Sequence, residues 1–153
     1  MAYKFSESKL LAAQTEIERY LAAQFPSDRI AVLSRRRGNL ENDIEASVAQ
    51  LGNIAVAVEA ALPSDYGDTV SDDVDIKTEI EIHILEDILL LSSNPVEIDG
   101  VSVNASNVLE GVIKCLNTFR IFGDSHPIFK PVRNFSEGSI THFALPVEFG
   151  AVI

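Results

Sequence analysis

A strict alternation of apolar and polar residues between Val74 and Ile84 is the clearest pattern in the chain. The β-branched positions are Val74, Ile76, Thr78, Ile80, Ile82 and Ile84, and the positions between them are Asp75, Lys77, Glu79, Glu81 and His83. A period of two predicts a β-strand, and one charged face is typical of an antiparallel or mixed sheet that is covered on one side. We therefore expect the isoleucines to pack on helices, and Glu79 and Glu81 to be exposed or to lie at an interface.

Three segments have the spacing of amphipathic helices. The first is predicted from Glu7 to Gln24, with Ser6 as N-cap, Glu7 in the first turn and Pro26 after its end. The second is predicted from Leu40 to Leu51, between the N-cap Asn39 and the stop signal Gly52. The third is predicted from Ala105 to Thr118, and its apolar face comprises Val108, Leu109, Val112, Ile113, Leu116 and Phe119.

Further strands are predicted on both sides of the alternating segment. They cover Arg29–Ser34, Asn53–Leu62, Val132–Ser136 and Ser139–Phe149, and the last two are joined by a turn at Glu137-Gly138. Residues 64–73, 86–103 and 123–131 are assigned to loops or irregular structure by their composition. The predicted order is α-β-α-β-β-α-β-β. It favours a single α+β domain over residues 1–153, with a mixed, mostly antiparallel sheet and about three helices packed on one face.

Composition agrees with one globular domain and excludes several classes of protein. The chain has 153 residues, of which 46% are apolar, and one cysteine, which rules out an internal disulfide framework. No apolar run approaches the roughly 18 residues that a membrane span needs. The N-terminal segment lacks the apolar core of a signal peptide, so we expect a protein of the cytosol.

Charge is distributed unevenly, and this bears on possible partners. Residues 38–113 hold sixteen acidic residues and one basic residue, Lys77, whereas residues 1–37 hold seven basic and four acidic ones. An acidic middle segment disfavours nucleic acid and anionic lipid, which need clustered cations. Two interpretations stay open, namely a solvated surface and electrostatic complementarity between copies of the chain.

Arg35, Arg36 and Arg37 form the one basic cluster of the sequence. They are either a solvated turn or a docking point for an acidic surface of a neighbouring copy, and without interleaved aromatic residues they make a poor nucleic-acid site. Our hypothesis for a subunit interface therefore comprises Arg35, Arg36, Arg37, Glu79 and Glu81.

The residues with catalytic or metal-binding chemistry form no recognisable motif. His83, His126 and His142 lack the spacing of a helical metal site, and His83 is expected to be a solvated surface residue. The adjacency of Asp124, Ser125 and His126 is no evidence for a triad, and Cys115 is expected to be a small buried residue. The acidic loop from Asp65 to Asp75 is interpreted as a solvated loop, with a calcium site as the alternative. We thus expect no catalytic residues, no cofactor and no metal.

The layout of the chain resembles the tail-terminator and minor tail proteins of long-tailed bacteriophages. The resemblance rests on the amphipathic helix at 6–25, the alternating strand at 74–87 that ends in an acidic turn, the helix at 104–116 and the closing hairpin at 132–149. It implies a non-enzymatic structural protein of a virion or prophage, assembled in the bacterial cytoplasm. Such proteins form homo-oligomeric rings, commonly hexameric, at the head-proximal end of the tail tube, where they contact tube and head-completion proteins. The alternatives are a calcium- or small-ligand-binding module and a small hydrolase.

Overall fold

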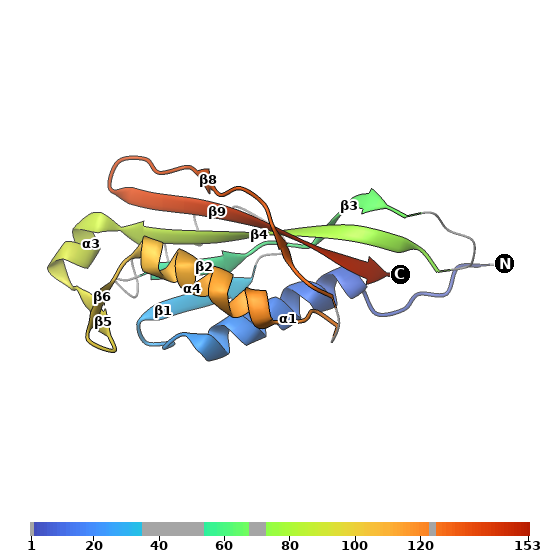
Figure 1. Ribbon diagram of the computed structural model, residues 1–153, viewed down its shortest axis with the longest axis horizontal. Coiled ribbons are helices and arrows are strands. Elements are labelled where there is room, and N and C mark those ends of the chain that lie inside the picture. Colours follow the sequence, from blue (N-terminus) through green and yellow to red (C-terminus); the bar gives the residue numbers. More distant parts are fainter. Residues whose placement is uncertain (1, 35–53, 68–72, 123–124) are drawn as a thin grey trace.

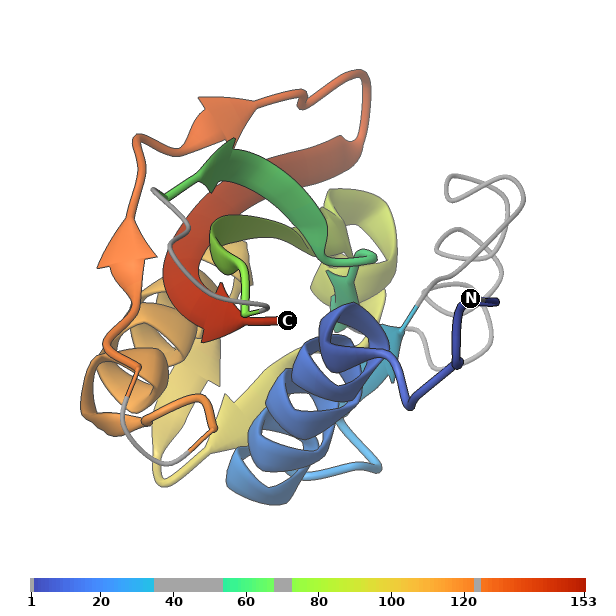
Figure 2. The ribbon, with the colours of Figure 1, turned by 90° about the vertical axis from the view of Figure 1, so that its right-hand side faces the viewer.

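The computed structural model describes residues 2–34, 54–67, 73–122 and 125–153. In chain order the elements are α1 (Lys9–Gln24), β1 (Ile30–Ser34), β2 (Ile54–Val58), β3 (Leu62–Tyr66), β4 (Asp75–Asp87), α3 (Ile88–Ser93), β5 (Val96–Ile98), β6 (Val101–Val103), α4 (Ala105–Thr118), β7 (Ile128–Phe129), β8 (Arg133–Asn134) and β9 (Ile140–Val152). Figure 1 shows α1 and α4 lying along one side of a long sheet, and Figure 2 shows them side by side beneath its curved strands. The predicted α+β class is confirmed.

The sheet is mixed but mostly antiparallel, as predicted. Its strands follow the order β1-β2-β4-β9-β7, while β3 also pairs with β4 and β8 with β9. The pair β1–β2 is parallel, and the other pairs of this sheet are antiparallel. The strands β4 and β9 pair without interruption from Asp75 opposite Val152 to Asp87 opposite Ile140. These two strands therefore form the spine of the molecule.

The core lies between the sheet and the helices α1 and α4. Ile80, Ile82 and Ile84 are fully buried and Ile76 is 3% exposed, so the predicted buried face of β4 is confirmed. The helical residues that pack in the same cluster are Ala13, Ile17 and Leu21 from α1, and Ala105, Val108, Val112 and Leu116 from α4. Each buried isoleucine contributes about 1.5–3 kcal/mol, so this face is a major source of the stability of the fold.

The two long helices begin with side-chain caps. The hydroxyl of Ser8 accepts a hydrogen bond of 3.1 Å from the Leu11 N–H, so α1 starts at Lys9 and not at Glu7. The predicted cap Ser6 was wrong, because the residue with extended backbone whose side chain accepts from the first turn is Ser8. The start and end of α4 are as predicted, with a capping box between Asn104 and Asn107.

A buried glutamate also stabilises the start of α4. Glu86, which is 7% exposed at the end of β4, accepts a hydrogen bond of 2.9 Å from the backbone N–H of Ala105. A carboxylate at a helix N-terminus satisfies an unpaired N–H group and complements the helix dipole. This contact fixes α4 against the sheet.

Several predicted boundaries in the middle of the chain need correction. The strand predicted over Asn53–Leu62 ends at Val58, and Leu62 begins β3, which includes residues that were assigned to a loop. All of β2 is buried, because it lies between β1 and β4 and because Ala55 and Ala57 pack in a second apolar cluster with Leu85. The predicted helix at 40–51 lies outside the described residues.

The segment 86–103 is ordered structure and not the irregular stretch that its composition predicted. The strand β4 continues to Asp87, whose carboxylate caps α3 by accepting hydrogen bonds from the N–H groups of Leu89 and Leu90. The strands β5 and β6 then form a hairpin, and its turn at Asp99-Gly100, which was predicted, has φ angles of 54° and 78°. Each of these elements is too short to show a periodic pattern.

The C-terminal hairpin is also redistributed. The strand predicted over Val132–Ser136 shortens to Arg133–Asn134, and β7 lies in a segment that was assigned to a loop. The predicted turn is present, with Gly138 at φ 60°, and β9 continues to Val152, beyond the predicted end at Phe149. No helix in the described part of the chain is long and apolar enough to cross a membrane.

Candidate functional site

The face of the sheet that is turned away from α1 and α4, here called the outer face, carries a group of polar side chains. On β4 this face holds the residues that alternate with the isoleucines, among them Glu79, Glu81 and His83. The strand register places His83 between Ala57 of β2 and Ala144 of β9. Because both neighbours have small side chains, room is left around the imidazole ring for longer side chains from adjacent positions.

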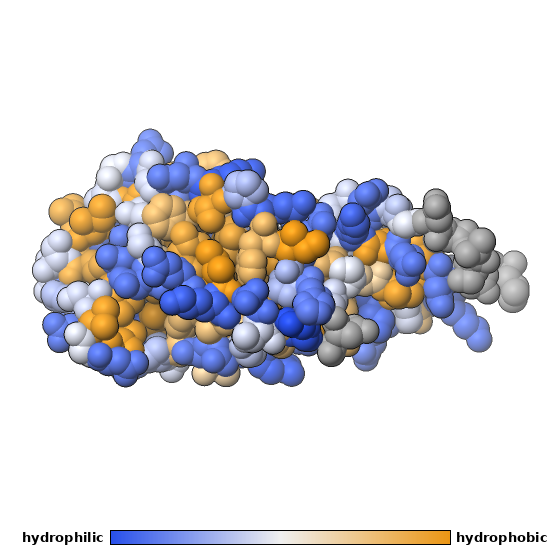
Figure 3. All heavy atoms as spheres, viewed as in Figure 1, coloured by the Kyte–Doolittle hydropathy of each residue, from blue (hydrophilic) through white to orange (hydrophobic). Residues whose placement is uncertain are grey.

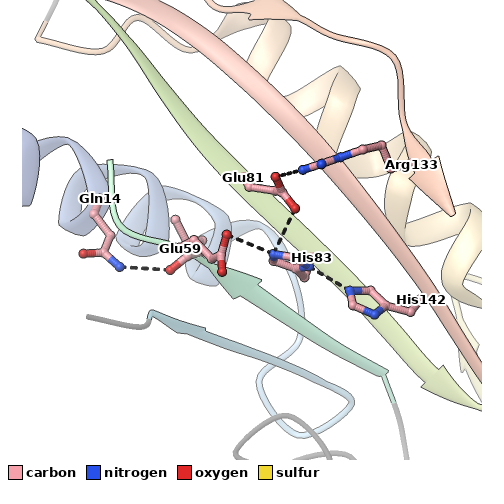
Figure 4. A network of polar contacts seen from close by, with 7 residues as sticks. Gln14, Glu59, Glu81, His83, Arg133 and His142 are labelled. Carbon is pink, nitrogen blue, oxygen red and sulfur yellow. Dashed lines mark hydrogen bonds and ion pairs between the residues drawn. The ribbon is translucent and has the colours of Figure 1, made fainter. Parts of the chain in front are cut away.

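Five residues from four segments meet around this ring (Figure 4). We call them the outer-face cluster, and they are Glu59, Glu81, His83, Arg133 and His142. The Nε2 atom of His83 lies 3.2 Å from Oε2 of Glu59 and 3.4 Å from Oε1 of Glu81. On the other side of the ring, Nδ1 of His83 lies 2.7 Å from Nε2 of His142. Arg133, from β8, forms an ion pair with Oε2 of Glu81.

The burial of His83 contradicts the sequence-based expectation of a solvated histidine. The residue is 5% exposed, and its Nε2 atom is buried without a hydrogen bond. The periodic pattern placed His83 on the polar face correctly, but that face is covered around His83 by neighbouring side chains. Glu59 and His142 are remote from His83 in the sequence, so no local signal could have brought them together.

The residues of the predicted subunit interface are only partly within the described chain. Glu79 and Glu81 both lie on the outer face and are half-buried, and Glu79 is directly opposite Glu148 of β9. The basic partner of Glu81 is Arg133 of the same chain. Arg35, Arg36 and Arg37 lie outside the described residues, so their proposed contact with an acidic surface stays a prediction.

The other residues that carried candidate chemistry are dispersed. His126 is exposed, and the Ser125 hydroxyl accepts a hydrogen bond of 3.0 Å from the Gly150 N–H. Cys115 is partly buried against the core, and this burial raises the pKa of its thiol, which is therefore protonated at neutral pH. Asp65 belongs to β3, while Asp68 and Asp72 of the acidic loop lie outside the described residues.

Large apolar side chains are exposed at both ends of the long axis and also between them, on the β7–β8 segment at Ile128, Val132 and Phe135. In the view of Figure 3 the widest apolar area lies near the centre of the molecule, with smaller areas toward each end. At the end that holds the C-terminus of β3, the C-terminus of β9 and the N-terminal arm, the strand-end patch comprises Tyr3, Phe5, Tyr66, Val152 and Ile153, each at least half exposed. At the other end, the hairpin-end patch comprises Ile88, Leu89 and Val101. Exposed apolar groups gathered in this way mark interaction surfaces.

The hairpin end is also hollowed. A cleft of about 390 Å³ lies between α3 and the β5–β6 hairpin, and its apolar walls include Leu91, Val96 and Val103. A cleft of this size is comparable to a small binding pocket. A second cleft of about 460 Å³ lies at the strand end, beside the start of β4 and the end of β9, and its lining includes Asp75, Ile76 and Val152. Both ends therefore combine exposed apolar side chains with a recess, but they are built from different residues.

Comparison of the chain with protein-family models and with curated protein sequences finds no match.

Proposed function

We propose that the protein is a non-enzymatic structural subunit that assembles with copies of itself into a ring, as a tail terminator or minor tail component of a long-tailed phage or a prophage. The observation that carries this proposal is the presence of two different apolar surfaces at opposite ends of one elongated subunit. The assignment to phage tails rests on the resemblance of the sequence pattern to that class of proteins.

Two different surfaces at opposite ends favour head-to-tail association. When the patch of one subunit meets a different patch of the next, the contact is heterologous, and repeated contacts form a ring if the rotation between subunits closes. Phe5 is 91% exposed and lies on the extended segment before α1, so it can reach a neighbouring subunit. We infer that the strand-end patch of one copy packs against the hairpin-end cleft and the hairpin-end patch of the next.

The proposal is tested with two variants, each defective at one end. Phe5→Lys with Tyr66→Lys changes the strand-end patch, and Leu89→Lys with Val101→Lys changes the hairpin-end patch. Each variant alone should no longer form oligomers, as measured by its molar mass in light scattering, because every contact needs both patches. An equimolar mixture should form dimers and stop there, because one intact pair of patches remains.

The matched control places two lysines at exposed polar positions, Ser27→Lys with Asn117→Lys, and it should assemble like the wild type. Wild-type protein should show closed rings in negative-stain images at high concentration. A wild-type chain that stays monomeric, or a mixture of the two variants that stays monomeric although each variant is folded, contradicts a heterologous ring. A gene remote from capsid and tail-tube genes contradicts the assignment to a phage tail.

A further inference from the structure

We propose that Glu59, Glu81 and His83 bind a divalent transition-metal ion of the zinc class on the outer face, with His142 holding the His83 ring. Among the described residues, these three form the one group of His, Cys, Asp or Glu whose ligand atoms all lie within 4.8 Å of one another. The proposal is independent of the ring proposed above, since neither apolar patch contributes a residue to the site.

The state of the His83 ring is the first argument for a metal ion. Nε2 is buried and forms no hydrogen bond, although two carboxylate oxygens lie 3.2 Å and 3.4 Å away. At these separations an N–H group that pointed at either oxygen would form a hydrogen bond, so neither oxygen is aligned with it. A buried polar atom without a partner is costly. A cation bound between Nε2 and the two carboxylate oxygens would give the nitrogen a partner.

The distances between the ligand atoms are the second argument. Zinc binds nitrogen and oxygen ligands at about 2.0–2.2 Å, so the ligand atoms of a tetrahedral zinc ion are about 3.3–3.6 Å apart. The two separations from Nε2 of His83 fall close to this range. An ion could therefore enter the site with small movements of the two glutamate side chains.

The contacts around the ligands are the third argument. With its proton on Nδ1, His83 donates to Nε2 of His142 at 2.7 Å and leaves the lone pair of Nε2 directed at the ion. Metal-binding histidines generally make such a contact through the second ring nitrogen, which fixes the tautomer and the orientation of the ring. Arg133 similarly holds the Oε2 atom of Glu81, so that Oε1 faces His83.

The donor set defines the class of metal. One imidazole and two carboxylates suit Zn²⁺ and neighbouring transition-metal ions, whereas Ca²⁺ and Mg²⁺ prefer sites built from oxygen alone. Three protein ligands leave a position for water, and the Glu59 side chain is 39% exposed, which gives solvent access. The site therefore has the ligand count of an open zinc site.

The test is calorimetric titration of the purified full-length chain with ZnCl₂ in a buffer that does not bind metals. A single Zn²⁺ ion should bind per chain, and CaCl₂ and MgCl₂ should not compete with it. Substitution with Co²⁺ should give the visible absorption bands of a four-coordinate site that contains nitrogen. Absence of stoichiometric Zn²⁺ binding, or displacement of Zn²⁺ by Ca²⁺, would overturn the proposal.

Two variants assign the site to these residues. Glu59→Gln keeps the shape of the side chain but removes the charge of a ligand. It should weaken Zn²⁺ binding by more than about tenfold, because in such sites even the loss of a residue that only contacts a ligand costs at least that much. His142→Gln should weaken it by about 10–100-fold while leaving the three ligands in place. The control Glu97→Gln changes an exposed glutamate of β5 and should bind like the wild type. Wild-type affinity in Glu59→Gln or in His142→Gln, with the fold verified by circular dichroism, would place the metal elsewhere.

Discussion

The two faces of strand β4 are built from alternate residues of the same segment, yet they are buried for different reasons. The inner face carries isoleucines that pack against α1 and α4. The outer face carries Glu81 and His83, which are covered by side chains from β8, β9 and the segment after β2. The inner face is stabilised by area, which many apolar side chains could supply, whereas the outer face around His83 is stabilised by particular polar contacts beside a small apolar cluster of Ala55, Ala57 and Leu85.

The largest effect should come from the inner face. Ile80→Ala should lower the free energy of unfolding by about 2–5 kcal/mol, because it removes a fully buried side chain and leaves a cavity. The neighbouring change Glu79→Ala should cost less than about 0.5 kcal/mol, as substitutions of partly exposed surface residues do. Glu79 also lies directly opposite Glu148, so its removal relieves a repulsion between like charges. Denaturant unfolding measures both values, and the reverse ranking would mean that the two faces have been exchanged.

The next effect should come from the centre of the outer-face cluster. His83→Ala should cost roughly 2–3 kcal/mol in the presence of a metal chelator, because it removes a buried ring together with its contacts to Glu59, Glu81 and His142. The control His126→Ala removes an exposed histidine and should stay within about 0.5 kcal/mol of the wild type. If the two histidine variants unfold at the same denaturant concentration, the outer face is merely solvated and the comparison between the faces fails.

A smaller effect should come from Gln14, one of the buried polar residues on the inner side. Gln14 is 2% exposed on α1, and its Nε2 atom donates a hydrogen bond of 3.0 Å to the backbone carbonyl of Val58 (Figure 4). Gln14→Ala should therefore cost about 1–2 kcal/mol, because the carbonyl at the end of β2 loses its partner. Gln24→Ala, at the exposed end of the same helix, is the control and should have no measurable effect on the thermal midpoint. Equal midpoints for the two variants would show that the bond contributes nothing.

The difference between the faces also explains what the sequence could predict. Burial of the inner face follows from a periodic pattern within one segment, so Ile76, Ile80, Ile82 and Ile84 and the whole of α4 were predicted correctly. The outer-face cluster depends on the register between β4, β9 and β8, which places Arg133 and His142 beside a strand that is distant in sequence. No local pattern encodes that register.

The short elements were not predicted, for a related reason. The helix α3 and the β5–β6 hairpin are too brief for a period to appear, and they are ordered by local contacts such as the Asp87 cap and the left-handed turn at Asp99-Gly100. The exposed apolar ends could not be inferred either, because an apolar residue in a sequence carries no sign of whether it is buried. The pattern around Leu62 and Tyr66 gave no indication that both are exposed.

The smallest effect per contact should be the dependence of assembly on salt, which compares the apolar ends with the predicted charge contact. If Arg35, Arg36 and Arg37 of one copy meet the acidic surface of the next, raising NaCl from about 0.05 M to 1 M should weaken assembly, since the screening length falls to about 3 Å. Exposed ion pairs contribute at most about 1 kcal/mol each, so the loss of three such pairs should raise the apparent dissociation constant by at most about 150-fold. Assembly should not be abolished, because burial of the apolar patches is not screened.

The triple Arg→Glu variant should stay folded. At low salt it should no longer form oligomers, because like charges repel, and at high salt it should form them again. Light scattering across a salt series measures both responses. A wild-type assembly that strengthens steadily with salt, or a triple variant that assembles like the wild type, would leave the apolar ends as the whole interface and the arginines as a solvated segment.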